Sequence, residues 1–450
     1  MANITFVSLG CDKNLVDTEI MLGLIESDGH KLIDNAKEAD VIIINTCGFI
    51  MDATKEGIDQ ILQLASYKER GICKALIVTG CMAQRYKDEI FEEMPEVDAV
   101  VGTTLFHTIG EVIKEVLAGT IRLKKVGNKD DDIEDLLHLR RKIEKGKHFA
   151  YLKIAEGCDK HCTYCTIPSI RGRYRSRKQE VIIEEAKLLV DAGVKEIILV
   201  AQDTTLYGTD LYKAKKLPEL LEELCKIEEL KWIRILYAYP EHIDDKIIDV
   251  MANNEKICNY IDMPIQHSHS DILKRMGRTT TTEKLKDKIL ELRKAMPDIV
   301  IRTTIMVGFP GEEEEHFEHM LRFIEEIKFD KLGVFSYSLE EGTKASEFLD
   351  QVKEYKKENR KHAIMEKQQQ ISKLNLQKYV KTKIIAMVDK KNEEGVYTAR
   401  GYMDSHDIDG LIFVDSQEVL VPGDFIEVLI THSTEYDLIG IVDSVHYSKV

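Results

Sequence analysis

The chain has 450 residues, of which 44% are hydrophobic, and a formal net charge of −16, so it is long and apolar enough for about three domains, each with its own core. A chain this acidic is a poor general binder of nucleic acid, because affinity for phosphate depends on basic surface. It has no signal-peptide pattern and no apolar run near the ~20 residues of a membrane helix, which predicts a soluble, cytoplasmic protein without a membrane partner.

Residues 1–120 alternate short apolar runs with longer stretches of helical periodicity. The runs at 4–9, 41–45, 75–79 and 99–102 predict strands, and those at 15–29, 53–63 and 86–94 predict helices. This alternation predicts an α/β domain built on an open parallel sheet with helices on both faces. The next segment, 121–148, is dense in charged residues and loses strand periodicity, so we expect a charged, solvated linker there.

The alternation resumes over residues 149–378. Six strand-like runs lie at 151–155, 196–202, 232–237, 260–263, 300–307 and 331–337, and helical stretches separate them. Six β/α units in one run predict a full or partial (β/α) barrel. The segment 351–378, rich in Lys, Glu and Gln, predicts an exposed helix. The tail, 379–450, holds five short strand-like runs with turn residues between them, which predicts a small five-stranded β-barrel.

The strongest chemical signal is the segment Cys158-Asp-Lys-His-Cys162-Thr-Tyr-Cys165, which follows the first barrel strand. Three thiolates on a cubane of four irons leave the fourth iron open to a substrate. A structural zinc ion, the alternative, needs a fourth protein ligand, for which His161 is the only nearby candidate. We therefore predict a 4Fe-4S cluster at the C-terminal rim of the barrel, where barrel enzymes keep their chemistry.

A second set of three cysteines shares one structural position. Cys11, Cys47 and Cys81 each follow one of the first three predicted strands. The carboxyl ends of parallel strands face one crevice, so these thiols can converge on a second cluster. Cys73 precedes its strand and belongs to the opposite edge. The other two cysteines, Cys225 and Cys258, are predicted to be buried small hydrophobes.

Several motifs resemble the methylthiotransferase family of radical S-adenosylmethionine enzymes. They are the segment 8–19 around Cys11, the runs Asn45-Thr46-Cys47 and Gly80-Cys81, the three-cysteine loop, and Val307-Gly308-Phe309-Pro310-Gly311-Glu312. The resemblance covers essentially the whole chain, including the tail barrel, which that family calls a TRAM domain. It implies an enzyme with two 4Fe-4S clusters that inserts sulfur into a C–H bond and delivers it as a methylthio group. One S-adenosylmethionine would supply the methyl group and another the radical, with the sulfur at the N-terminal cluster.

Two branches of that family differ in substrate. One modifies an adenosine of transfer RNA, and the RimO-type branch modifies the β-carbon of an aspartate in small-subunit ribosomal protein number twelve. The run Cys11-Asp12-Lys13-Asn14 resembles the ribosomal branch, since the transfer-RNA branch typically has Gln-Met-Asn after that cysteine. The runs at 202–205 and 264–267 also resemble the ribosomal branch. Transfer RNA remains the alternative substrate.

Charge in the tail favours the protein substrate. Residues 378–450 contain seven Lys or Arg and thirteen Asp or Glu. A barrel that grips RNA should be basic, whereas an acidic one suits a basic ribosomal protein. We expect Asp404, Asp407 and Asp409 to be among the carboxylates that hold it.

Other residues are expected at the rim of the central barrel. Gln202, Asp203 and Gly308 end two of its strands and are candidates to contact S-adenosylmethionine. The basic run 171–178 either lines the mouth of the cleft or is a solvated strand. The family also implies an electron donor such as flavodoxin or ferredoxin. A non-catalytic electron carrier is the rival function, but such carriers have fully ligated clusters in small domains.

Overall fold

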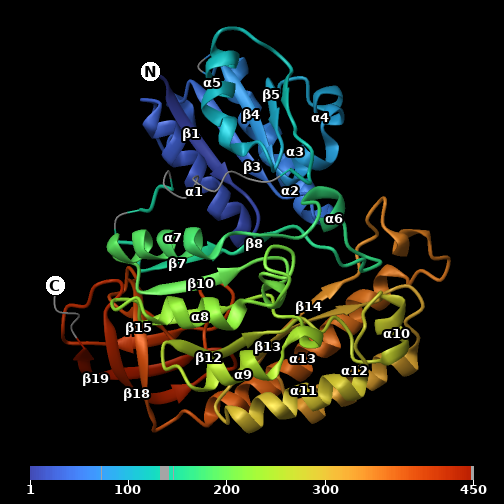
Figure 1. Cartoon of the computed structure of the whole chain (residues 1–450), viewed down its shortest axis with the longest axis vertical. Coiled ribbons are helices and arrows are strands. Elements are labelled where there is room, and N and C mark those ends of the chain that lie inside the picture. The colour runs from blue at the N-terminus through green and yellow to red at the C-terminus, as the bar shows by residue number, and fades with distance from the viewer. Residues whose placement is uncertain (72, 132–140, 145, 447–450) are drawn as a thin grey trace.

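The computed structural model describes residues 1–71, 73–131, 141–144 and 146–446. Figure 1 shows an N-terminal α/β domain standing on a larger body, which consists of a central α/β barrel and a small β-barrel at its lower left. Within the described ranges, no helix is both long enough and apolar enough to cross a membrane.

The N-terminal domain is a six-stranded parallel sheet with the order β2-β1-β3-β4-β5-β6. Its strands are β1 (Asn3–Ser8), β2 (Lys31–Leu32), β3 (Val41–Thr46), β4 (Ala75–Gly80), β5 (Ala99–Val101) and β6 (Leu123–Lys125). Its helices are α1 (Asp12–Ser27), α2 (Met51–Glu69), α3 (Cys81–Tyr86), α4 (Asp88–Glu93) and α5 (Ile109–Leu117). Strands β3 and β4 are buried along their whole length, because helices cover both faces of the sheet. The predicted fold of this domain is confirmed.

The predicted linker 121–148 needs two corrections. Strand β6 lies inside it and pairs with β5, so the N-terminal sheet continues to residue 125. Arg141 is not solvated either, because its side chain is only 2% exposed and bridges Glu19 of α1 and Glu185 of the barrel helix α7 (Gln179–Asp191). The part 132–140 lies outside the described residues. Arg141 thus fastens the N-terminal domain to the barrel.

The central domain is a partial barrel of six parallel strands in the order β14-β13-β12-β11-β10-β7. The strands are β7 (Phe149–Lys153), β10 (Glu196–Val200), β11 (Trp232–Ile235), β12 (Ile257–Asp262), β13 (Val300–Val307) and β14 (Lys331–Ser336). The helices after α7 are α8 (Leu217–Cys225), α9 (Asp245–Ala252), α10 (Ser270–Arg275), α11 (Thr282–Ala295), α12 (Glu314–Ile327) and α13 (Glu354–Gln377). The helix α13, predicted to be exposed, buries one face that includes Ile364 and Ile371.

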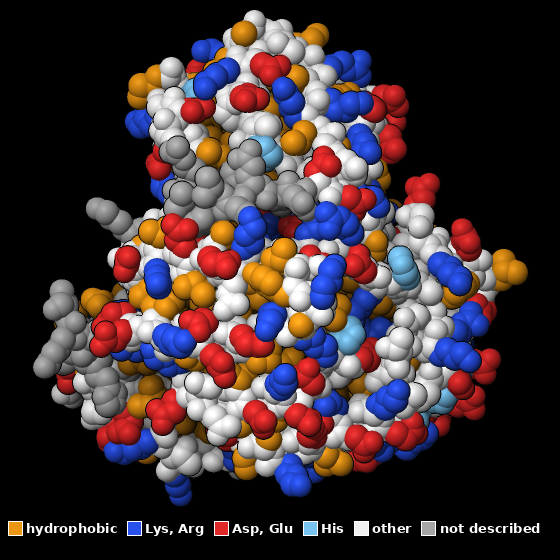
Figure 2. Space-filling model, in the orientation of Figure 1, with side chains coloured by type: hydrophobic (Ala, Val, Ile, Leu, Met, Phe, Trp, Pro, Cys, Tyr) orange, Lys and Arg blue, Asp and Glu red, His pale blue; other side chains and the backbone are white. Residues whose placement is uncertain are grey.

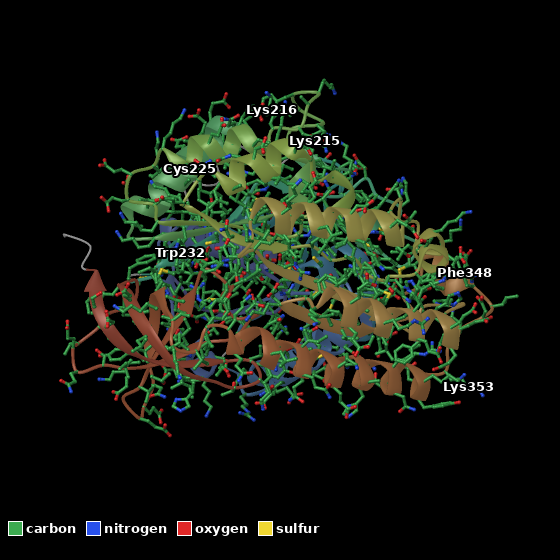
Figure 3. The ribbon with its side chains drawn as sticks, turned by 90° about the horizontal axis from the view of Figure 1, so that it is seen from below. Lys215, Lys216, Cys225, Trp232, Phe348 and Lys353 are labelled. Carbon is green, nitrogen blue, oxygen red and sulfur yellow. The ribbon has the colours of Figure 1, made fainter. Side chains whose placement is uncertain are left out.

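The C-terminal domain is a closed five-stranded barrel with the order β15-β16-β17-β19-β18, as predicted. Its strands are β15 (Lys383–Lys391), β16 (Tyr397–Gly401), β17 (Ile412–Asp415), β18 (Phe425–Ser433) and β19 (Leu438–His446). Trp232 at the start of β11 packs edge-on against Phe425 of β18, with ring centroids 4.9 Å apart. Figure 3 shows Trp232 beside the strands of the small barrel, with Cys225, the last residue of α8, above it.

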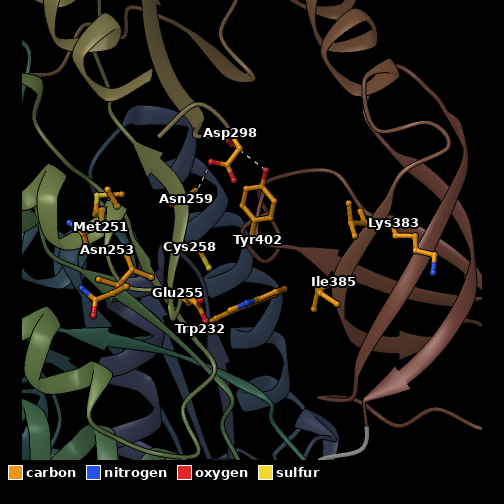
Figure 4. Close-up of a pocket in the computed structure, with 14 residues that line it drawn as sticks. Trp232, Met251, Asn253, Glu255, Cys258, Asn259, Asp298, Lys383, Ile385 and Tyr402 are labelled. Atoms are coloured by element: carbon orange, nitrogen blue, oxygen red, sulfur yellow. Dashed lines mark hydrogen bonds between the residues drawn. The ribbon is translucent and has the colours of Figure 1, made fainter. Parts of the chain in front are cut away.

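A cleft of about 680 Å³ separates the two barrels next to this contact. Trp232, Asp298, Lys383 and Tyr402 are among its lining residues, and the Tyr402 hydroxyl donates to the backbone carbonyl of Asp298 at 3.2 Å (Figure 4). The cleft lies at the amino ends of β11 and β12. It is therefore at the opposite end of the sheet from the predicted cluster loop, which follows the carboxyl end of β7.

The expectation that the acidic tail residues hold the substrate is wrong for two of the three named. Asp404 is 3% exposed and pairs with Lys331 at 2.8 Å. Asp409 accepts a hydrogen bond from the Tyr260 hydroxyl at 2.7 Å. Both carboxylates therefore bind side chains of the central barrel and do not face the solvent. Only Asp407 is exposed. Figure 2 shows acidic and basic side chains interspersed over this face of the molecule rather than one acidic patch.

Candidate cluster and cofactor site

The three-cysteine loop begins where the chain leaves the first barrel strand. The short strands β8 (Ala155–Glu156) and β9 (Arg175–Ser176) pair on either side of it and close its base. Gly157 has a φ of 77°, and a Cβ there would lie 1.9 Å from the carbonyl oxygen of Arg173, so only glycine fits this turn. Met276 anchors the loop from outside, because its backbone carbonyl accepts a hydrogen bond from the N–H of Thr163 within the loop, at 3.0 Å.

The three sulfurs of this loop are close enough for their charges to act on one another. Burial raises the pKa of the Cys158 thiol to about 11 and also raises the pKa of Cys165. A buried thiol ionises only beside a positive charge that pairs with the thiolate. A metal ion supplies that charge and binds the deprotonated form. His161, the fourth zinc ligand that the sequence offers, is exposed while the cysteines are largely buried. The donor set therefore fits three ligands with an open metal position better than a closed zinc site.

The second set of cysteines stands at the carboxyl ends of three neighbouring strands, β1, β3 and β4. Cys11 is the N-cap of α1, Cys47 follows β3, and Cys81 is the first residue of α3. Two glycines allow the close approach. A Cβ on Gly10 would lie 3.3 Å from the Cβ of Cys47, and one on Gly48 would lie 2.8 Å from the backbone of Met82.

Burial governs the ionisation of these thiols as well. It raises the pKa of Cys81 to about 11, against the opposing effect of the Arg171 guanidinium, and it raises the pKa of Cys47. The charges of Cys11 and Cys47 both act to raise the pKa of Cys81, so the three thiols are neighbours. Helix N-termini favour anionic ligands, and two of these cysteines start helices. The set fits a second three-thiolate cluster.

The segments that carry the two sets of cysteines are in contact at the boundary between the domains. Thr166, next to Cys165, donates its hydroxyl to the carbonyl of Phe49, two residues beyond Cys47, at 3.3 Å. A second bridge joins Arg85 of α3 to Glu340 after β14, at 2.9 Å, with side chains 10% and 3% exposed. The sequence predicted each set separately, but it carried no signal that they meet.

The predicted cofactor residues have different surroundings. Gln202 donates its amide to Glu156 at 3.0 Å, and its buried Oε1 has no hydrogen-bond partner among the described residues. Asp203 is fully buried and engaged by Lys160, His242 and Thr205. It therefore orders these groups around the cluster loop. Gly308, with a φ of 70°, packs against the stem of Lys357.

Sequence reasoning missed Arg278, which follows α10. Its side chain is 1% exposed, pairs with Glu241 at 3.2 Å, and lies 4.3 Å over the Tyr239 ring. Its Nη1 has no hydrogen-bond partner within the described chain, and the charge of Cys162 acts on it. An unpaired buried donor beside the cluster loop suits an acidic group on a bound cofactor. Arg278 lies more than ten positions from the nearest motif, so its position in the sequence gave no signal of a role in the site.

The basic run 171–178 is neither simply a cleft lining nor a solvated strand. Arg171 and Arg175 are buried, whereas Arg173 and Lys178 are exposed. Cys73 precedes β4 and so lies at the opposite end of that strand from Cys81, and Cys258 is buried as predicted. Cys225 is half-buried, less than predicted.

Comparison with protein families agrees with this architecture. Residues 152–324 match the radical SAM superfamily, residues 3–102 match the uncharacterized protein family UPF0004, and residues 381–442 match the TRAM domain. The chain also has the fold of TsrM from Kitasatospora setae, a radical S-adenosylmethionine methyltransferase, with a TM-score of 0.54, 12% identity, and 74% of each chain covered. The fold and the cysteine loop thus define a radical S-adenosylmethionine enzyme.

Close relatives place the chain more narrowly. It is 51% identical over 438 residues to the ribosomal protein uS12 methylthiotransferase RimO of Lachnoclostridium phytofermentans, covering 97% of this chain and 99% of the relative. It is 48% identical to the protein of the same name from Acetivibrio thermocellus, with 97% of each chain covered. The chain belongs to the RimO family of methylthiotransferases. The family and fold class predicted from the sequence are confirmed.

Proposed function

We propose that this enzyme attaches a methylthio group to the β-carbon of an aspartate in ribosomal protein uS12, in the cytoplasm. The observation that carries the proposal is the pair of three-cysteine sets, whose flanking residues Thr166 and Phe49 are in contact at the domain boundary, in a chain of the RimO family. The N-terminal set would hold the sulfur to be transferred, and the barrel set would supply the radical chemistry. The acidic tail no longer supports the choice of substrate, which rests on the relatives and on the run at Cys11.

The residues present fit the cofactors. Cys158, Cys162 and Cys165 would hold one 4Fe-4S cluster, and Cys11, Cys47 and Cys81 the other. When bound, the barrel cluster and S-adenosylmethionine together supply the radical chemistry that opens an unactivated C–H bond. An electron donor such as flavodoxin or ferredoxin would reduce the cluster.

The chain itself contributes orientation and exclusion of water. Arg278 offers an unpaired buried donor for the carboxylate of S-adenosylmethionine, and Gln202 offers an unpaired buried acceptor. Asp203 holds Lys160 and His242 in place beside the loop. Fixed, buried donors and acceptors cost no reorganisation when the cofactor binds, so they would hold it in one orientation.

The proposal is tested with the reconstituted enzyme under anaerobic conditions. Wild type, given reductant, S-adenosylmethionine and uS12, should add one methylthio group to the protein, as read by mass spectrometry. Iron analysis should find about eight irons per chain, and about four after alanine replacement of either set of cysteines. About four irons in the wild type, or bound zinc, would contradict the ligand assignment.

Each triple variant serves as the control for the other, because the two should lose different activities. Without Cys158, Cys162 and Cys165, no 5′-deoxyadenosine should form. Without Cys11, Cys47 and Cys81, cofactor cleavage should persist while the methylthio product is lost. Transfer RNA is the matched competing substrate, and its modification in place of uS12 would favour the other branch of the family.

A further inference from the structure

Arg171 is a buried cation at the boundary between the two cysteine sites. It follows α6 (Ile167–Ile170), directly after the cluster loop, and its side chain is 2% exposed. One end of its guanidinium, Nη2, lies 3.3 Å from the Cys81 sulfur and donates to the side-chain oxygen of Asn14. The other end, Nη1, lies 3.0 Å from both Asp17 and Glu156.

The charges around Arg171 balance before any metal is added. Lys153 also pairs with Asp17, at 2.5 Å, and with Glu156, at 2.8 Å. These two cations and two carboxylates have side chains no more than 7% exposed. Removal from water is costly for such groups unless each is paired. Nη1 of Arg171 takes part in these ion pairs, and Nη2 does not. Nη2 is therefore free to donate to the Cys81 sulfur.

The same residues belong to different domains. Asn14, Asp17 and Cys81 lie in the N-terminal domain, while Arg171 and Glu156 lie at the rim of the barrel. Glu156 also accepts from Gln202, the residue with the unpaired oxygen in the cofactor site. A continuous chain of hydrogen bonds thus runs from a ligand of one cluster site to the rim of the other.

We propose that Arg171 is a positioning residue for the N-terminal cluster, acting through a charged N–H that it donates to the Cys81 ligand. The proposal rests on the ligand assignment proposed above. Its hydrogen bond fixes the sulfur against the barrel, so that the two cluster sites keep one relative placement. It also withdraws negative charge from a ligating sulfur, which stabilises the reduced cluster and raises its reduction potential.

The test isolates the N-terminal cluster by replacing Cys158, Cys162 and Cys165 with alanine. In this background, the midpoint potential is measured by a redox titration followed by electron paramagnetic resonance. Arg171→Lys keeps the charge but loses the planar fork. A double variant, Arg171→Met with Glu156→Gln, removes one charge of each sign and keeps the site balanced. Both should retain the cluster and shift its potential to more negative values, the double variant further.

Arg141→Lys is the matched control. Arg141 is also 2% exposed and also bridges carboxylates of both domains, but no cysteine is among its ion-pair partners. It should leave the potential unchanged. An unaltered potential in both Arg171 variants, with iron retained, would overturn the proposal. So would loss of iron accompanied by unfolding in both, because the role of Arg171 would then be merely structural.

These outcomes are distinct from failure of the proposed function. If the parent variant without Cys158, Cys162 and Cys165 binds no iron, the ligand assignment is wrong and the Arg171 variants have no cluster to tune. If the parent holds about four irons and Arg171→Lys has the parental potential, only the role of Arg171 is wrong.

Discussion

Replacement of Glu196 by alanine should undock the C-terminal barrel from the central one. Glu196 is fully buried at the start of β10, between Arg234 of β11 and Arg400 of β16, at 2.8 and 2.7 Å. Burial alone would raise the pKa of this carboxyl, but the two guanidinium groups outweigh burial and hold the pKa below its ordinary value. The carboxylate is therefore charged, and its loss leaves two buried cations short of a partner.

The magnitude follows from that geometry. Breaking a buried ion pair by removing one partner costs about 3–5 kcal/mol, which shifts the ratio of docked to undocked forms by about a hundred- to a few-thousand-fold. An exposed pair costs about 0–1 kcal/mol. The pair of Lys286 and Glu326, with side chains 34% and 58% exposed, supplies the matched control, Glu326→Ala.

The single tryptophan of the chain makes the assay specific. Trp232 is 8% exposed and packs on Phe425 of the small barrel. Its emission should therefore move to longer wavelength when the barrels separate. A urea titration should place this change at a much lower concentration in Glu196→Ala than in Glu326→Ala. Equal midpoints for the two variants would refute the reasoning.

Three further predictions concern the loop geometry, the pH dependence and the tail. Gly48→Ala should abolish the N-terminal cluster, read as a loss of about four irons, because its Cβ would meet the backbone of Met82 at 2.8 Å; Gly333→Ala, with no atom within 4 Å, should keep it. Burial would raise the pKa of Glu185, but Arg177 and Arg141 lower it from 4.5 to about 2. Its stabilisation is therefore complete above pH 4.5 and lost toward pH 2, so the stability difference between wild type and Glu185→Gln in urea should shrink over that range. Truncation after residue 377 should lower the melting temperature, measured by circular dichroism, because Glu196 loses one of its two arginine partners, Arg400, and Lys331 loses its buried partner Asp404; an unchanged melting temperature would contradict this.

The sequence by itself determined the parts of this protein that depend on local order along the chain. The spacing of Cys158, Cys162 and Cys165 places three sulfurs on one loop whatever surrounds it. Cys11 and Cys81 could be assigned to one site because a parallel sheet brings the carboxyl ends of its strands to one edge. The five strands of the tail were readable from alternating apolar residues and turns.

Only the tertiary structure decided which charged residues are buried. Arg171 was expected at the mouth of the cleft or on a solvated strand, and Asp404 on a surface that holds the substrate, so neither was predicted to be buried in an ion pair. Their partners come from other domains: Asp17 lies 154 positions from Arg171, and Lys331 lies 73 positions from Asp404. A charge can leave water only where a distant chain segment supplies its counterion, and no local pattern records that meeting. For the same reason, the contact between the segments that carry the two sets of cysteines emerged only from the folded chain.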